Sequence, residues 1–184
     1  MTEPAARVIV RIPSHEHSPG RKGATDNNMD ILDELKKLAK ELEDKGIDYA
    51  LCGGLAIAVY ARPRATLDID IMIDSDSVSR TTAAVNDMGF TISGPPMYFH
   101  DNAVVIHRFV KIDRNTGEHL VLDLIIATQT IQKAWEDRIT IDWDGYPLKV
   151  LSPPGLILLK SLRNSGQDKD DIEYLRSLEY EDQD

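Results

Sequence analysis

The run of residues from Ala50 to Asp74 restricts the fold more than any other part of the chain. An apolar stretch that ends at Cys52 predicts a short strand, and the small apolar residues after Gly53 and Gly54 predict a helix. A second strand follows, in which Leu67, Ile69, Ile71 and Ile73 alternate with Asp68, Asp70, Met72 and Asp74. We therefore expect a strand–turn–helix–strand unit with Asp68 and Asp70 on one face of the second strand.

The Asp68-x-Asp70 pair predicts a cation site. Two strand rises separate the two Cα atoms by roughly 6.5–7 Å, so the carboxylates lie side by side. Two like charges on a half-buried sheet repel each other and cost stability unless a cation lies between them. Hard divalent cations prefer carboxylate oxygens. The alternative for this pair alone is a solvated strand face.

Gly53 and Gly54 predict an anion site beside that pair. Glycines let the backbone approach a ligand closely, and the N-terminus of the helix that follows presents N–H groups to negative charge. An ordinary tight turn explains a Gly-Gly pair equally well. A phosphate-binding turn about fourteen residues before a carboxylate pair, within one strand–helix–strand unit, is more specific and indicates nucleotide chemistry.

Asp123 is the third acidic residue that indicates a site. It interrupts the run 121–126, which is otherwise apolar on both faces, as in a central strand buried from two sides. A buried carboxylate without a partner costs several kcal/mol, so Asp123 needs a cation, hydrogen-bond donors or a proton. Beside Asp68 and Asp70 it would complete a cluster of three carboxylates. The alternative is an ordinary ion pair with one Arg or Lys.

The remaining patterns divide the chain into three parts. We expect residues 1–28 to form a flexible tail, residues 29–152 a core, and residues 153–184 helices that pack on this core. In the core, an amphipathic helix should run from Asp30 to Gly46 and further strands should cover 47–52, 104–112 and 119–127, with a loop at 94–102 and a hairpin at 138–151. Lys160 lies on the apolar face of a C-terminal helix. It could be a functional cation or simply an exposed lysine whose aliphatic stem covers that face.

Composition excludes several classes of protein. The formal net charge of −10 argues against a broad surface for nucleic acid. Cys52 is the one cysteine, so no internal disulfide forms, which suits a reducing cytoplasm, and a buried structural thiol is the expected role of this residue. No apolar run approaches the roughly 20 residues that a membrane span needs.

Together these residues resemble the DNA polymerase β-type nucleotidyltransferase superfamily. The resemblance rests on Gly53-Gly54, on the run Arg64-x-Thr66-x-Asp68-x-Asp70 and on Asp123, and it covers about residues 30–180. It is strongest to small bacterial nucleotidyltransferases related to abortive-infection toxins and to aminoglycoside nucleotidyltransferases. Lys160 and the later Asp168-x-x-Asp171-Ile172 resemble the C-terminal helices of that group.

The resemblance implies an α/β (α+β) fold with a mixed central sheet, flanking helices and a C-terminal helical element. It implies a nucleoside triphosphate such as ATP as donor and two Mg²⁺ ions. Asp68 and Asp70 match the metal-binding pair, and Asp123 matches the carboxylate that binds a metal and activates the acceptor hydroxyl. The glycine turn matches the triphosphate site. Arg64, Thr66 and Lys160 match more loosely as phosphate contacts.

Two positions depart from the family pattern. Gly54 stands where the family often has Ser, and the segment 165–167 replaces the usual Arg before the final Lys-Asp element. We expect an enzyme that transfers a nucleoside monophosphate to an acceptor hydroxyl with release of pyrophosphate. The acceptor is open among a small molecule, a tRNA and a protein. The alternative is a toxin–antitoxin module that acts mainly by binding a partner protein, in which case an antitoxin is the implied partner.

Overall fold

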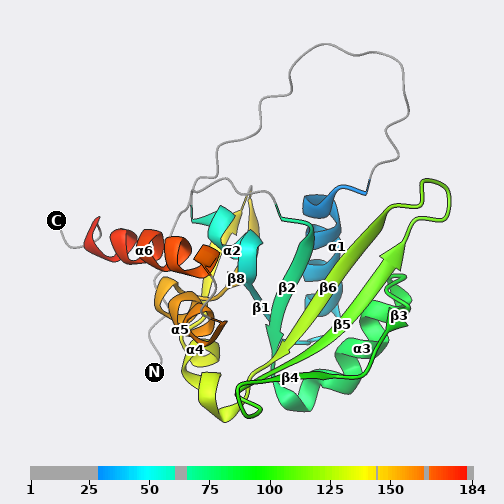
Figure 1. Ribbon diagram of the computed structural model, residues 1–184. Helices are drawn as coiled ribbons and strands as arrows, with labels where there is room; N and C mark the ends of the chain where they lie inside the picture. The colour runs from blue at the N-terminus through cyan, green and yellow to red at the C-terminus, as the bar shows by residue number, and fades with distance from the viewer. Residues whose placement is uncertain (1–28, 61–65, 144, 164–165, 182–184) are drawn as a thin grey trace.

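A computed structural model describes residues 29–60, 66–143, 145–163 and 166–181 (Figure 1). Within these residues the strands form one eight-stranded sheet in the order β3-β5-β6-β2-β1-β8-β7, and β4 pairs with β5. The strands are β1 Ala50–Cys52, β2 Asp68–Ile73, β3 Ile92–Ser93, β4 Met97–Phe99, β5 Val104–Ile112, β6 His119–Ile126, β7 Ile139–Trp143 and β8 Tyr146–Val150. The helices are α1 Ile31–Asp44, α2 Gly53–Val59, α3 Val78–Asp87, α4 Gln132–Glu136, α5 Pro153–Arg163 and α6 Gly166–Glu181, with 3₁₀ turns at Ser75–Ser77 and Gln129–Ile131.

The sheet is mixed, as predicted. β2 runs parallel to β6 and β1 runs parallel to β8, whereas β1–β2, β5–β6 and β7–β8 are antiparallel. The parallel pairing of β2 and β6 places Asp70 directly opposite Asp123. This register fixes the position of the candidate site.

Helices cover the sheet at two places (Figure 1). α1 and α3 lie behind the strands β2, β6 and β5, and α4, α5 and α6 gather near β1 and β8. α1 begins where the Asp30 side chain accepts hydrogen bonds from the backbone N–H groups of Leu32 and Asp33, which satisfies donors that the first turn leaves free. Its apolar residues recur every three or four positions, and Leu38 and Leu42 are almost completely buried.

Two predicted segments differ from the structure. The predicted loop 94–102 is wrong at Met97–Phe99, because these residues pair with β5 as strand β4. The predicted strand 47–52 forms a strand only at Ala50–Cys52. The backbone N–H of Ile47 instead donates a hydrogen bond to the carbonyl oxygen of Leu42 at the end of α1. The Asp48 side chain is paired with Arg138 and Lys149. The predicted tail at residues 1–28 lies outside the described residues.

None of the helices in the described part of the chain combines the length and the apolar character that a membrane crossing requires.

Candidate active site

The structure brings the three predicted carboxylates together. Asp68, Asp70 and Asp123 each offer an oxygen, and these three oxygens lie within 4.8 Å of one another. Period-two alternation places Asp68 and Asp70 on the same face of β2, and the parallel register adds Asp123 from β6. Asp70 and Asp123 are 8% and 3% exposed, so most of this negative charge lies in a poorly solvated place. We call these three residues the carboxylate cluster.

The glycine turn lies against the carboxylate cluster. Cys52, the last residue of β1, pairs with Asp70, so the chain turns at Gly53 directly over that side chain. Gly53 has a φ of +64°, and a Cβ atom built on it would lie 1.9 Å from Asp70 Oδ2. Any side chain at this position would therefore have to displace the carboxylate. Glycine is required at position 53 for two reasons. The backbone is in the left-handed region, and a side chain would collide with Asp70.

Thr66 connects the glycine turn to the first carboxylate. Its hydroxyl donates a hydrogen bond of 2.8 Å to Asp68 Oδ1. A Cβ atom at Gly54 would lie 2.9 Å from the Thr66 hydroxyl oxygen, so Gly54 lets the threonine pack against the turn. Arg64, the other residue predicted in this segment, lies outside the described residues.

Arg108 on β5 is a site residue that we did not predict from the sequence. Its Nε donates to Asp123 Oδ1 at 2.8 Å and its Nη2 donates to Asp123 Oδ2 at 2.7 Å. The hydrogen bond to Asp123 raises the pKa of Arg108, and the charges of Asp68 and Asp70 act in the same direction. Asp123 therefore belongs to the carboxylate cluster. It also forms the ion pair with an arginine that the sequence analysis gave as the alternative to this role.

Comparison with known proteins places the chain in a family. A family model described as "Uncharacterised nucleotidyltransferase" matches residues 18–169, which is most of the chain. The chain belongs to this nucleotidyltransferase family. No curated protein sequence matches it significantly.

One solved structure supports the fold of this nucleotidyltransferase, and a second gives a lower TM-score. The lincosamide antibiotic adenylyltransferase LnuA, solved with lincomycin bound, superposes with a TM-score of 0.52 at 17% identity, over 79% of this chain and 96% of LnuA. A candidate nucleotidyltransferase from Thermotoga maritima gives a TM-score of 0.49 at 15% identity, over 81% of this chain and 90% of that protein. At such identity the likeness to LnuA concerns the fold alone. It agrees with the predicted mixed sheet and flanking helices.

The thiol of Cys52 is a structural group in this nucleotidyltransferase. It is completely buried, and burial raises its pKa well above the ordinary value, with further contributions from the charges of Asp70 and Asp123. A thiol in this environment stays neutral and is a poor nucleophile. The predicted structural role of Cys52 is consistent with this burial.

Lys160 is buried between the two C-terminal helices. It is 8% exposed, and its ammonium lies 3.1 Å from Asp168 Oδ1 and 2.7 Å from Asp171 Oδ2, both on α6. The alternative of an exposed lysine is therefore wrong. Its predicted contact with phosphate stays a prediction, and it would require the ammonium to share its charge with these two acids. Lys160 is close enough to Cys52 to lower the pKa of the thiol slightly.

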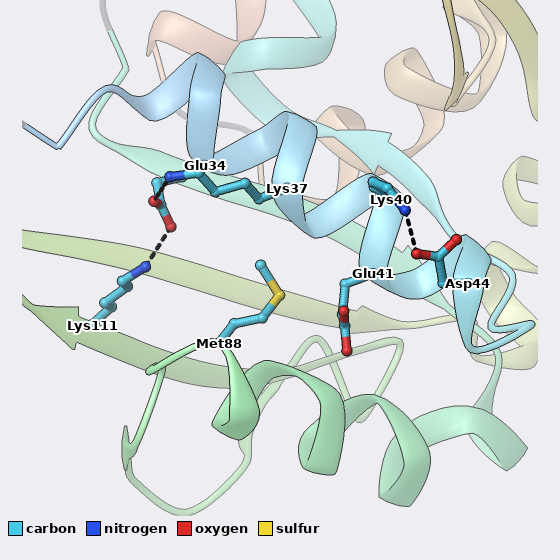
Figure 2. Close-up of a pocket in the computed structure, with 7 residues that line it drawn as sticks. All are labelled: Glu34, Lys37, Lys40, Glu41, Asp44, Met88 and Lys111. Carbon is cyan, nitrogen blue, oxygen red and sulfur yellow. Dashed lines mark hydrogen bonds and ion pairs between the residues drawn. The ribbon is translucent and has the colours of Figure 1, made fainter.

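A cavity of about 340 Å³ lies apart from the carboxylate cluster (Figure 2). Its lining comes from α1, from the end of α3 and from β5, and consists of Glu34, Lys37, Lys40, Glu41, Asp44, Met88 and Lys111. The ion pairs drawn in Figure 2 join Glu34 to Lys37 and Lys111, and Lys40 to Asp44. Lys111 and Arg108 are three residues apart on one strand, so they point to opposite faces of the sheet. The cavity thus lies on the face away from the cluster.

The contact between Gly53 and Asp70 gives a first testable prediction. Gly53→Ala should lower the free energy of unfolding by more than the roughly 1–2 kcal/mol that a left-handed alanine costs, because the new methyl group also displaces the Asp70 carboxylate. Urea denaturation measures this loss, and Mn²⁺ titration should show weaker metal binding.

Gly117→Ala is the matched control for this prediction. Gly117 also has a positive φ, +76°, but nothing lies within 4 Å of a Cβ built there. This variant should lose only the cost of backbone strain and should bind Mn²⁺ as the wild type does. Equal stability losses in the two variants, together with unchanged Mn²⁺ binding, would show that the contact with Asp70 is unimportant.

Proposed function

We propose that this protein transfers a nucleoside monophosphate from a nucleoside triphosphate to an acceptor hydroxyl, with release of pyrophosphate, in a reaction that depends on divalent metal. The observation that supports this proposal best is the set of three carboxylate oxygens within 4.8 Å of one another, directly under a turn where no side chain fits. Membership of the nucleotidyltransferase family supports the same reaction class.

The residues of the cluster suit Mg²⁺. All three ligands are carboxylate oxygens, which hard divalent cations prefer, and two of the three are almost completely buried. Arg108 supplies one positive charge against three negative ones, so the site can accept further cations. We assign Asp68 and Asp70 as ligands of two Mg²⁺ ions and Asp123 as a ligand of one. When bound, the ions would neutralise the attacking and leaving oxygens of an in-line displacement.

The other roles in this proposal come from the family resemblance. The acceptor oxygen forms a bond to the α-phosphorus, the bond from that phosphorus to the oxygen bridging to the β-phosphate breaks, and pyrophosphate leaves with the electron pair. Asp123 accepts the proton of the acceptor hydroxyl. On the strength of the family resemblance we assign the turn at Gly53 and Gly54 as the triphosphate site, and Thr66 holds the Asp68 carboxylate in place.

Arg64 and Lys160 are further phosphate contacts in this proposal, on the strength of the family resemblance. They would act as cations toward a ligand that carries several negative charges.

A small molecule with a free hydroxyl is the first acceptor class to test, and ATP is the first donor. LnuA, which shares the fold, is an adenylyltransferase for lincosamide antibiotics. The net charge of −10 disfavours a long RNA as acceptor. The alternative of a toxin–antitoxin module stays an untested prediction, and the clustered carboxylates favour catalysis over it.

Transfer of label from each nucleoside triphosphate tests the proposal. Purified protein should be incubated with Mg²⁺, a cell extract separated by size, and one α-³²P-labelled nucleoside triphosphate at a time. We expect label in the small-molecule fraction and an equal amount of pyrophosphate. With a γ-³²P label, the radioactivity should appear in pyrophosphate and not in the acceptor, which separates nucleotidyl from phosphoryl transfer. No labelled acceptor with any donor, together with no heat of nucleotide binding in calorimetry, would refute the proposal.

A further inference from the structure

Arg108 donates hydrogen bonds to both carboxylate oxygens of Asp123, the third member of the cluster. The fork of the guanidinium binds Asp123 Oδ1 through Nε and Asp123 Oδ2 through Nη2, and the two residues lie directly opposite each other on the antiparallel strands β5 and β6. Such bidentate pairs between Arg and a carboxylate are among the stronger hydrogen-bonded contacts in proteins. Asp123 therefore has a partner of its own before any metal arrives.

The two members of this pair differ in their exposure. The side chain of Asp123 is 5% exposed, whereas that of Arg108 is 49% exposed. The carboxylate is thus fixed within the sheet, while the guanidinium faces solvent on one side and can move without unpacking the core. The strand registers place Arg108 opposite Asp123 and Asp123 opposite Asp70, so the guanidinium lies beside the cluster. One mobile cation accordingly neutralises part of the charge of the whole cluster.

A divalent ion on Asp123 conflicts with this arrangement. Two of the roughly four lone-pair sites of the carboxylate are already used by Arg108. An ion at the remaining sites would place two positive charges within a few ångströms of the guanidinium, and the buried side of the site screens this repulsion less than bulk water does. Arg108 and a metal ion therefore compete for the same carboxylate.

We propose that Arg108 is an exchangeable counter-ion that positions Asp123 while the site lacks metal and gives up at least one of its two hydrogen bonds when a divalent ion binds. This inference rests on the proposed function, since it assumes that the cluster binds metal. The exchange gives the buried Asp123 carboxylate a cationic partner both with and without metal. It also makes the metal affinity of the nucleotide-free enzyme lower than that of a cluster without Arg108. Metal would then bind more tightly once a nucleotide brings additional negative charge.

Mn²⁺ titration without nucleotide, followed by electron paramagnetic resonance, tests the competition. Arg108→Gln should bind Mn²⁺ about tenfold more tightly than the wild type, the change expected from losing one competing charge-assisted hydrogen bond. Arg108→Lys keeps the positive charge and should stay within about threefold of the wild type. A purely structural arginine predicts the reverse, namely weaker Mn²⁺ binding in Arg108→Gln because Asp123 is no longer held in place.

His107→Gln is the matched control, because His107 is the neighbour of Arg108 on β5 and points to the other face of the sheet. It should bind Mn²⁺ as the wild type does. If the wild type binds Mn²⁺ and Asp70→Asn does not, but Arg108→Gln matches the wild type, the counter-ion inference fails and the proposed function stands. If the wild type binds no Mn²⁺ even with a non-hydrolysable nucleotide, the proposed function fails and the inference fails with it.

A measurement on the wild type avoids dependence on the folding of a variant. The Nε–H signal of Arg108, assigned in a ¹⁵N spectrum by its absence from Arg108→Lys, should be protected from exchange with solvent in the free protein. Addition of Mg²⁺ should shift this signal and accelerate its exchange, because a hydrogen bond to Asp123 is lost. A signal that Mg²⁺ leaves unchanged at saturation of the metal site would overturn the proposal.

Discussion

Replacement of Asp70 by Asn should reduce the rate of nucleotidyl transfer by at least about 100-fold. Loss of a residue that only supports a metal ligand commonly costs about 10–100-fold, and Asp70 is assigned as a ligand itself. Asparagine keeps the size of the side chain beneath Gly53, so the turn has no reason to move. Because one of three neighbouring negative charges disappears, the remaining carboxylates repel each other less in the metal-free protein.

Asp87→Asn is the matched control for Asp70→Asn. The side chain of Asp87 is 70% exposed on α3 and makes a surface ion pair of 3.4 Å with Lys45. Such pairs contribute about 0–1 kcal/mol, so this variant should keep both its stability and its rate. The initial rate of pyrophosphate release measures the effect on catalysis, and Mn²⁺ titration measures the effect on binding. If Asp70→Asn retains more than a tenth of the wild-type rate, Asp70 is not a metal ligand in the reaction.

The sequence was sufficient for the local part of the site. Alternation along 68–73 places Asp68 and Asp70 on one face whatever lies beside the strand, because the period of a strand is two. The Gly-Gly turn is equally local, since its backbone needs no distant partner. The position of Asp123 required more, namely that β6 pairs with β2 in parallel. The sequence predicted that Asp123 lies beside Asp68 and Asp70 but not the direction of its strand, and the structure supplies that direction through the register that sets Asp70 opposite Asp123.

The partners of the charged residues were harder to predict, because they depend on register between segments. Arg108 meets Asp123 only because the β5–β6 turn has a specific length, with Gly117 at a φ of +76° and the Asp113 carboxylate accepting from the backbone of Asn115. A shift of one residue would send the arginine to the opposite face. Counting back from Asp123 across the short connection between the predicted strands 104–112 and 119–127 was the signal that could have found Arg108. Pairing of Lys160 with α6 depends on how two helices pack, which sequence periodicity does not determine.

Loss of the buried lysine should have the largest effect on stability. Lys160→Met should lower the free energy of unfolding by about 3–5 kcal/mol, because it removes the ammonium from a buried ion pair with two carboxylates. Asp168 and Asp171 are each 5% exposed and would face each other without the ammonium that lies between them. Methionine preserves most of the volume of lysine, so a cavity contributes little to the loss. Urea denaturation of the two proteins measures the difference.

Two comparisons separate this structural role from the predicted contact with phosphate. Lys169→Met removes an exposed lysine from the same helix pair and should change stability by no more than about 0.5 kcal/mol. The combined variant Lys160→Met, Asp168→Asn and Asp171→Asn should recover most of the stability lost in Lys160→Met, because the two carboxylates are then neutral as well. Should Lys160 act chiefly on the nucleotide, Lys160→Met would unfold at the wild-type urea concentration and bind ATP more weakly. The combined variant would then restore nothing, because neutralising the acids of α6 cannot replace a cation facing the triphosphate.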